Sequence, residues 1–271
     1  MKLIVEKLVT ELNHQAIVQD ISFYVNEGEF VGVIGPNGSG KSTLLKTLYR
    51  VLKPAEGAVM LDDEAITSYQ HKEFAKKVAV VGQESSVPFD FSVLDLVLMG
   101  RNPHKRLLDQ ETKVDHDIAI DALKHVGLEG YEQRSFATLS GGEKQRVIIA
   151  RAIAQEPSFF ILDEPTNHLD IHHQLHILDV LQRSNMTVLT ALHDLNLAAS
   201  YCDRIIVMQD GRLVANGSPK ETLTKQLLEE VFQVEATIWT HPLTQKVQVM
   251  YVSPGMKQGI FDHQLKSWLQ S

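Results

Sequence analysis

The sequence predicts an α/β fold with a mostly parallel sheet, an N-terminal antiparallel β region and a helical subdomain inserted in the core. Short apolar runs alternate with helical patterns in residues 30–49 and 159–208, which is typical of parallel strands joined by helical crossovers. Residues 85–155 interrupt this alternation, because they show helical spacing and no strand-like run. Two partly alternating segments precede the core and supply the antiparallel region.

The expected elements follow in chain order. The N-terminal strands cover residues 2–8 and 17–25, and a polar bend through Asn13 and His14 joins them. The predicted core elements are strands at 30–34, 58–61, 78–81, 159–163, 186–192 and 204–208, and helices at 43–49, 172–184 and 194–201.

The tail is expected to hold strands at 235–240 and 247–252 and a short helix near 264–269. These elements predict a main domain at 1–232, with a helical subdomain at about 85–155. A short C-terminal extension at 233–271 completes the predicted organisation.

The composition is that of a globular protein, with 44% hydrophobic and 22% charged residues in a chain of 271. No run approaches the roughly 18 apolar residues of a membrane span, and the N-terminus lacks the apolar segment of a signal peptide. The net charge of −8 argues against broad electrostatic binding to nucleic acid. Cys202 is the single cysteine and cannot form an internal disulfide.

A glycine-rich loop between the strand at 30–34 and the helix at 43–49 is the most specific motif. It reads Gly35, Pro36, Asn37, Gly38, Ser39, Gly40, Lys41, Ser42 and matches the pattern Gly-x-x-x-x-Gly-Lys-Ser/Thr without a mismatch. Glycines let backbone N–H groups surround a polyphosphate, and the helix N-terminus adds unpaired donors. Lys41 is expected to reach the β/γ phosphates, and Ser42 to offer its hydroxyl to Mg²⁺. The loop predicts a P-loop NTPase core, with an ordinary glycine-rich turn as the alternative.

The strand at 159–163 ends in two carboxylates, Asp163 and Glu164. Ligands of open α/β sheets bind at the carboxyl ends of the strands. We therefore expect Asp163 to lie beside the phosphate loop and to hold Mg²⁺, directly or through water. Glu164 would then orient or polarise the attacking water. Solvated acids at the end of a strand are the structural alternative.

A third motif opens the helix at 144–154 with Ser140, Gly141, Gly142 and Glu143. Ser140 and Glu143 have the spacing of a capping box. The cap does not explain two glycines at the first helical positions, where glycine costs helix stability. A bare helix N-terminus lets another surface approach closely and offers a second anion site.

With these motifs in place, the chain resembles the nucleotide-binding subunit of an ATP-binding-cassette (ABC) transporter. Residues 139–143 are similar to the signature motif LSGGQ, with glutamate in place of the final glutamine. Gln83 matches the Q-loop glutamine, residues 167–170 match the D-loop, and His193 matches the switch histidine. The resemblance spans about residues 3–230.

The resemblance implies where ATP and Mg²⁺ would bind. Residues from Gly35 to Thr43 would wrap the phosphates, and Glu164 would act on the attacking water. Ser42, Gln83 and Asp163 would serve Mg²⁺.

The same resemblance implies a head-to-tail dimer that holds two ATP molecules between its subunits. His193 would contact the γ-phosphate, and Asp170 would lie at the dimer contact. Residues 140–143 would complete the ATP site of the second copy.

Two features of the sequence leave alternatives open. His168, His172, His173 and His176 cluster near the D-loop, and His172 and His176 have the i,i+4 spacing of a metal pair. A polar helix face is the favoured explanation.

At the position where the family stacks an aromatic residue on adenine, this chain has Leu12, although His14 is near enough to substitute. The Asn-Lys-x-Asp pattern of guanine-specific NTPases is absent, so the resemblance favours ATP.

Residues 87–104 carry the resemblance further, to ATPases of importers for iron siderophores, haem and cobalamin, in which a Gly-Arg-x-Pro-His run is common. In those proteins this region forms a groove for a helix of the integral membrane permease. The apolar residues that would line the groove, or else belong to the core, are Phe89, Phe91, Val93 and Leu94.

The resemblance therefore implies an ATPase at the cytoplasmic face of the cell membrane, served indirectly by an extracytoplasmic substrate-binding protein, with no nucleic-acid partner. Zinc or manganese importer ATPases and soluble non-transport ABC ATPases are the alternatives.

Overall fold

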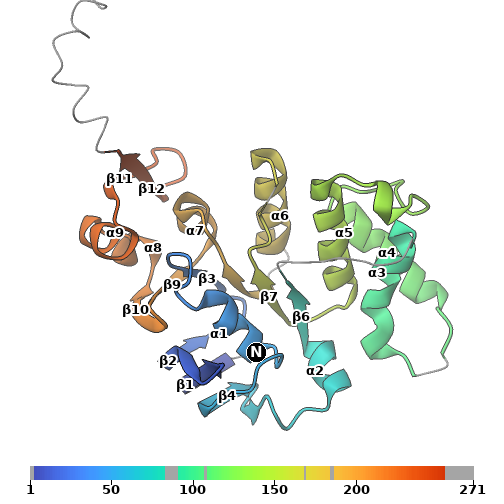
Figure 1. The fold of residues 1–271 in the computed structure, drawn as a ribbon. Coiled ribbons are helices and arrows are strands. Elements are labelled where there is room, and N and C mark those ends of the chain that lie inside the picture. Colours follow the sequence, from blue (N-terminus) through green and yellow to red (C-terminus); the bar gives the residue numbers. More distant parts are fainter. Residues whose placement is uncertain (1–2, 83–90, 107–108, 168, 184–185, 254–271) are drawn as a thin grey trace, which may run out of the picture.

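The computed structural model describes residues 3–82, 91–106, 109–167, 169–183 and 186–253 (Figure 1). Its central sheet has six strands in the order β10-β9-β3-β8-β7-β6. They are β3 (Phe30–Ile34), β6 (Val78–Val81), β7 (Phe159–Asp163), β8 (Thr187–Ala191), β9 (Arg204–Gln209) and β10 (Arg212–Gly217). All pair in parallel except β10, which is antiparallel to β9. The predicted α/β fold with a mostly parallel sheet is confirmed.

The antiparallel region is a second sheet in the order β2-β1-β4-β5. It consists of β1 (Leu3–Leu12), β2 (Gln15–Val25), β4 (Glu56–Leu61) and β5 (Glu64–Ala65). Asn13 and His14 form its first turn with φ of 50° and 62°, a conformation that asparagine tolerates. The prediction placed only the N-terminal strands here, and the structure adds β4 and β5 from beyond the phosphate loop.

Helix α1 (Lys41–Leu48) is buried between the two sheets. Its apolar residues Leu44, Leu45 and Leu48 share one hydrophobic cluster with side chains of both sheets. Helices α6 (Ile171–Arg183) and α7 (Leu195–Tyr201) cover the opposite face of the central sheet (Figure 1). Because both faces are covered, β3, β7 and β8 are buried along their whole length, which explains their unbroken apolar runs.

The helical region follows β6. Its elements are α3 (Val93–Leu98), the 3₁₀ helix η1 (Met99–His104), α4 (Lys113–His125), the 3₁₀ helix η2 (Phe136–Thr138) and α5 (Gly141–Ala154). Within the described part of 91–155, the only extended pairing is an isolated bridge between Ser92 and Ser135. The predicted helical character is observed, while the boundaries of a subdomain at about 85–155 stay a prediction.

The C-terminal part adds a two-stranded hairpin of β11 (Glu235–Thr240) and β12 (Val247–Val252), where the sequence predicted strands. Ala236, Val247 and Val249 bury one side of this hairpin in the same hydrophobic cluster as α7. The helix predicted near 264–269 lies outside the described residues.

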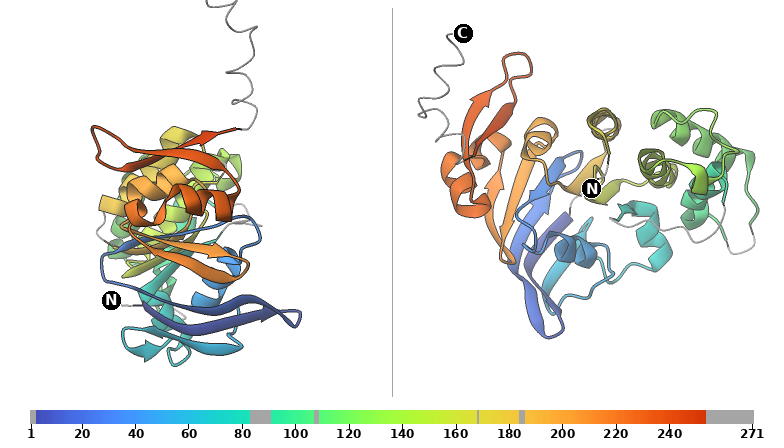
Figure 2. Two further views of the ribbon diagram at one scale, coloured as in Figure 1. Left: turned by 90° about the vertical axis from the view of Figure 1, so that its left-hand side faces the viewer. Right: turned by 45° about the horizontal axis from the view of Figure 1, so that its top comes forward.

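Elements that the sequence patterns missed are β5, β10, α2 (His71–Lys77), α8 (Pro219–Thr222) and α9 (Lys225–Phe232). Among the described residues, no helix combines the length and apolarity needed to cross a bilayer. Figure 2 shows the antiparallel sheet at one end of the molecule and the β11–β12 hairpin at another.

Candidate active site

The phosphate loop joins the carboxyl end of β3 to the first turn of α1. Gly38 and Gly40 have φ of 80° and 96°, a backbone conformation that side chains with a Cβ rarely adopt. A Cβ on Gly35 would clash with the carbonyl oxygen of Met208, and one on Gly40 would press on that of Ile17. The glycines are therefore required by the conformation of the loop and by the neighbouring strands.

The loop encloses a hollow of about 340 Å³. Its walls are Ile17, residues 37–43 and Glu164. The first backbone N–H groups of α1 have no partners within the helix, so they can donate to an anion in this hollow. Size and donors fit a nucleotide polyphosphate.

Lys41 is held across the loop and is 5% exposed. Its Nζ donates to the carbonyl oxygens of Gly35 at 2.8 Å and Pro36 at 3.1 Å. Burial lowers the pKa of this ammonium, while the nearby charges of Glu164 and Asp163 oppose the shift. The side chain thus places a positive charge at the loop, where an anion would relieve the cost of its burial.

Ser42, in the first turn of α1, meets Asp163 at the carboxyl end of β7, as predicted from their positions. The Ser42 hydroxyl donates to Asp163 Oδ1 at 3.1 Å. Asp163 is 2% exposed, and burial together with the charge of Glu164 raises the pKa of its carboxyl group. A hydroxyl and a buried carboxylate are oxygen ligands of the kind that Mg²⁺ prefers, and a cation there would stabilise the charged carboxylate. The residues present therefore fit the predicted ion.

Glu164 follows Asp163 in the left-handed backbone region, with φ of 56°. That conformation is uncommon for a side chain with a Cβ and is often found at functional sites. Its backbone N–H donates to the Ala191 carbonyl oxygen at 3.2 Å, which ties it to the end of β8. Its carboxylate pairs with His193 Nε2 and accepts from Asn167 Nδ2. The structure thus brings together the two residues predicted to be catalytic.

His193 owes its position to the connection between β8 and α7. Asp194 caps α7 by accepting from the backbone N–H groups of Asn196 at 2.7 Å and Leu197 at 2.9 Å. The His193 side chain remains 39% exposed. It can therefore turn away from Glu164 without unpacking the core.

The signature residues form a complete capping box at the start of α5. Ser140 N donates to Glu143 Oε2 at 2.8 Å, and Glu143 N donates to Ser140 Oγ at 3.3 Å. The backbone N–H and the hydroxyl of Ser140 both donate to the Glu143 carboxylate and lower its pKa to about 2. A Cβ on Gly141 would meet no atom within 4 Å, whereas one on Gly142 would lie 3.5 Å from Leu169 Cδ2, so the helix start is open at Gly141 only. The described residues that line the phosphate hollow do not include 140–143, so the two anion sites are separate within one copy.

Asp170 lies just before α6 and caps it. Its Oδ1 accepts from His173 N at 2.9 Å and contacts His173 Nδ1 at 2.8 Å. Asp170, His172 and His173 bring ligand atoms within 4.8 Å of one another, a grouping different from the predicted pair His172 and His176. The bonds within the group explain it as a helix cap.

The opposite wall of the phosphate hollow contains Ile17, which the sequence patterns missed. An isoleucine in an alternating strand has no sequence signal that separates it from the core. Leu12, the position expected to face adenine, is 38% exposed on β1. Gln83, predicted to serve Mg²⁺, lies outside the described residues.

In the segment predicted to meet the permease, the structure decides one alternative that the sequence left open. Val93 is fully buried at the first turn of α3 and cannot line a groove, because it belongs to the core. Phe91 and Leu94 are half-buried and pack against that core. Phe89 and the rest of 87–90 lie outside the described residues.

The Gly-Arg-x-Pro-His run has an internal structural role that the sequence did not indicate. Arg101 is 6% exposed and donates from Nε to Asp115 Oδ1 at 3.1 Å. Its Nη1 donates to the Ala154 carbonyl oxygen at 2.7 Å and to Glu156 Oε2 at 2.8 Å. The run therefore fastens η1 to α4 and to the end of α5.

Comparison with known proteins agrees with the geometry of the site. A family model for the ABC transporter matches residues 18–167. The ferric enterobactin transport ATP-binding protein FepC of Escherichia coli is 38% identical over 242 residues, which cover 88% of this chain and 89% of that protein. The hemin import ATP-binding protein HmuV of Hahella chejuensis is 40% identical over 256 residues, covering 89% and 97%. One solved structure that superposes on this chain is described as an inward-facing conformation of a metal-chelate type ABC transporter. The TM-score is 0.79 at 31% identity, and the superposition covers 92% of this chain and 96% of the chain in that structure. This chain belongs to the ABC transporter family.

Proposed function

We propose that this chain is the ATP-hydrolysing subunit of an importer for iron siderophores, haem or cobalamin, acting through separate membrane subunits. The relatives support the cargo class, because they are named for import of ferric enterobactin, hemin, iron(3+)-hydroxamate and cobalamin. The main observation for the chemistry is the juxtaposition of the phosphate loop, the Ser42–Asp163 pair and the Glu164–His193 pair.

Each residue then has one task. Lys41 and the backbone N–H groups of residues 37–43 bind the β- and γ-phosphates. Ser42 and Asp163 would hold Mg²⁺, which neutralises charge on the phosphates when bound. Gln83 is proposed as a further Mg²⁺ contact on the resemblance alone.

Glu164 orients the attacking water and accepts its proton at the carboxylate. In the structure His193 Nε2 is paired with the Glu164 carboxylate. His193 therefore has to turn toward the γ-phosphate before Glu164 can accept the proton of the attacking water. Because His193 is partly exposed, this movement needs no change in the core. ATP binding would thereby release the catalytic carboxylate.

We also propose that two copies act together head to tail. Residues 140–143 and Asp170 are not among the residues that line the phosphate hollow of their own chain, and the start of α5 is open at Gly141. A second copy would place these residues on the ATP held by the first. Solved relatives include the dimeric cassette MJ0796, with a TM-score of 0.71 at 28% identity.

The remaining partners rest on the resemblance. Residues 87–104, with Phe91 and Leu94 as the described apolar contacts, would meet the permease at the cytoplasmic face of the membrane. A substrate-binding protein would deliver cargo from the other side. Adenine would lie near Ile17, which borders the phosphate hollow.

The test is Glu164→Gln, which removes the charge and keeps the shape. ATP binding should stay within about twofold, while turnover should fall by about 100-fold or more, since general-base contributions are typically 10²–10⁴. Turnover near wild type under saturating Mg·ATP would contradict the assignment. In a strain lacking the gene, uptake of labelled iron siderophore, haem and cobalamin then identifies the cargo, with Glu164→Gln as the inactive control. Uptake that changes only for zinc or manganese would favour the alternative importer class.

A further inference from the structure

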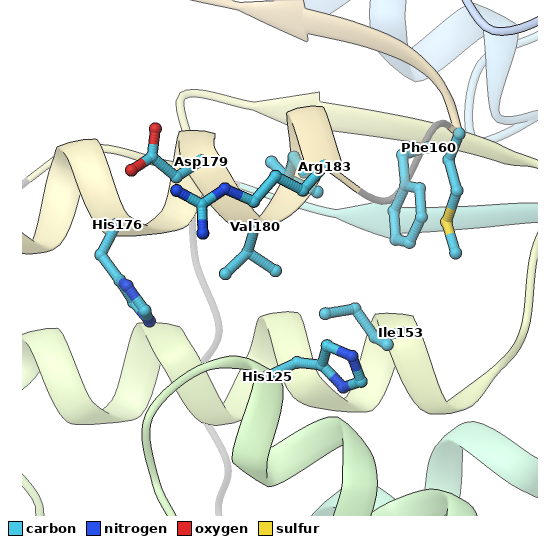
Figure 3. Close-up of a pocket in the computed structure, with 9 residues that line it drawn as sticks. His125, Ile153, Phe160, His176, Asp179, Val180 and Arg183 are labelled. Atoms are coloured by element: carbon cyan, nitrogen blue, oxygen red, sulfur yellow. The ribbon is translucent and has the colours of Figure 1, made fainter.

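A second cavity, of about 490 Å³, lies away from the phosphate hollow (Figure 3). It is bounded by α6 on one side and by the ends of α4 and α5 on the other, with β7 beneath. Its lining shares no residue with that of the phosphate hollow. The proposed ATPase chemistry does not use it.

The floor of this cavity is apolar. Ile153 of α5, Val180 of α6 and Met186 before β8 are half-buried side chains that face the space, and the buried Phe160 closes it below. Figure 3 shows Val180 and Ile153 directed toward each other from facing helices. Water in contact with such walls is displaced favourably by an apolar molecule.

The edge of the cavity carries basic side chains from two elements. His125 ends α4, while His176 and Arg183 belong to α6. His176 Nε2 is buried, and the imidazole ring interacts with the backbone of Val126, while the neighbouring Arg146 Nε is buried without a hydrogen-bond partner among the described residues. Burial and, after it, the charge of Arg146 lower the pKa of His176, while the bond to the Val126 backbone and the charge of Asp179 oppose the shift.

Asp179 is the one acidic side chain in the lining, and it is already engaged. Its Oδ1 accepts from the Tyr201 hydroxyl at 3.0 Å. Figure 3 shows its carboxylate turned away from Ile153 and His125. Arg183 lies one turn further along α6 and is exposed, and Figure 3 shows its guanidinium beside Asp179, although the structure records no ion pair between them.

We propose that this cavity binds a small amphipathic anion, with an apolar body over Ile153 and Val180 and its charged group at Arg183 and His176. The exposed guanidinium of Arg183 and the imidazole of His176 supply the donors at the edge of the cavity, and a hydrogen bond to a charged group is among the stronger ones in proteins. The cavity lies between α5 and α6, and these helices begin directly after Ser140 and Asp170, the proposed dimer contacts. A bound molecule would therefore set the distance between the two helices, and we assign the site a regulatory role on the dimer.

The test uses two fluorescent probes with the same body, 8-anilino-1-naphthalenesulfonate and its uncharged counterpart N-phenyl-1-naphthylamine. We expect one saturable site for the sulfonate, with octanoate as a competitor. Arg183→Met should weaken the sulfonate about tenfold and leave the uncharged probe within twofold. Lys220→Met, which removes an exposed cation on α8, is the matched control and should change neither.

Val180→Trp fills the cavity from α6 and should abolish binding of both probes, and Ile153→Phe fills it from α5. The melting temperature establishes that each variant is folded, and loss of binding in either folded variant is enough to support the site. If both probes still bind to a folded, filled variant, the cavity is not their site and the proposal is overturned. If Arg183→Met weakens both probes equally, or neither, the cavity does not select an anion. ATPase activity of the wild type does not enter the test, so its outcome is independent of the proposed function.

Discussion

Arg101→Met should be among the most destabilising single changes in the helical region, although Arg101 lies in a segment first linked to the permease. Asp115 is only 7% exposed, and the substitution removes the guanidinium that pairs with its carboxylate. It also removes the donor to the Ala154 carbonyl oxygen. Breaking a buried ion pair from one side costs about 3–5 kcal/mol. Thr112 still donates to Asp115, and Lys105 Nζ lies 3.8 Å away, so we expect the lower part of that range, about 3–4 kcal/mol.

Thermal unfolding measures this loss. An unfolding entropy of roughly 2.1 cal/mol/K per residue gives about 0.6 kcal/mol/K for 271 residues, so the Tm should fall by about 5–7 °C. Lys124→Met is the control, because its pair with Asp121 at 3.1 Å is solvent-exposed and should shift the Tm by less than about 1 °C. Adding Asp115→Asn to Arg101→Met should recover part of the loss, since it removes the unpaired charge. A fall below about 2 °C for Arg101→Met would refute the reasoning.

The pH dependence gives an independent check on the same pair. The bonds from Thr112 and Arg101 lower the pKa of Asp115 in the folded protein, against the opposing effect of its burial. The stability from its charged form is therefore present above the unfolded pKa of about 4, and it is lost as the pH falls toward the lower folded value. The difference in Tm between the wild type and Arg101→Met should therefore be largest at pH 7, and it should become smaller below about pH 4.

Three further predictions concern the proposed function. Lys41→Ala should weaken ATP binding at equilibrium by about tenfold or more, because the loop loses its one buried cation, and unchanged affinity in a calorimetric titration would contradict the loop assignment. Mixing Glu164→Gln with Ser140→Arg subunits should restore part of the ATPase rate, because one of the two shared sites would be intact, and no recovery despite heterodimers would contradict the head-to-tail arrangement. Phe91→Asp should leave the subunit folded and able to bind ATP but should prevent co-purification with the membrane subunits, and normal assembly would place the contact elsewhere.

Motifs whose chemistry is local were predictable from the sequence. The glycines of the phosphate loop, the carboxylates after β7 and the capping box of Ser140 and Glu143 are each defined by a few adjacent residues. The position of the carboxyl ends of parallel strands was enough to bring Asp163 to Ser42, 121 residues away.

Features that depend on packing between distant segments were not predictable. In the sequence Arg101 looks like a surface cation, because its burial depends on α4 and α5, which come later in the chain. Ile17 looks like a core residue, because only the folded phosphate loop places it at the hollow. For Val93 the sequence left a groove and the core as alternatives, because apolar residues in a helix do not reveal which neighbour covers them. Strand β10 was not predicted, because only its pairing with β9 distinguishes its sequence from that of a polar loop.

The position of β3 in the central sheet has a consequence for synthesis on the ribosome. The strand ends at Ile34, yet both of its neighbours, β8 and β9, come from residues 187–209. From Ile34 to Gln209 the ribosome adds 175 residues (209 − 34), which takes about 9–35 s at roughly 5–20 residues per second. During that time both edges of the apolar strand β3 lack their hydrogen-bonding partners. The phosphate loop that follows β3 also lacks the neighbouring strands that position it. The nascent chain is therefore expected to need chaperone protection until its last third emerges, because the loop's contacts with Met208 and Gly211 form only then.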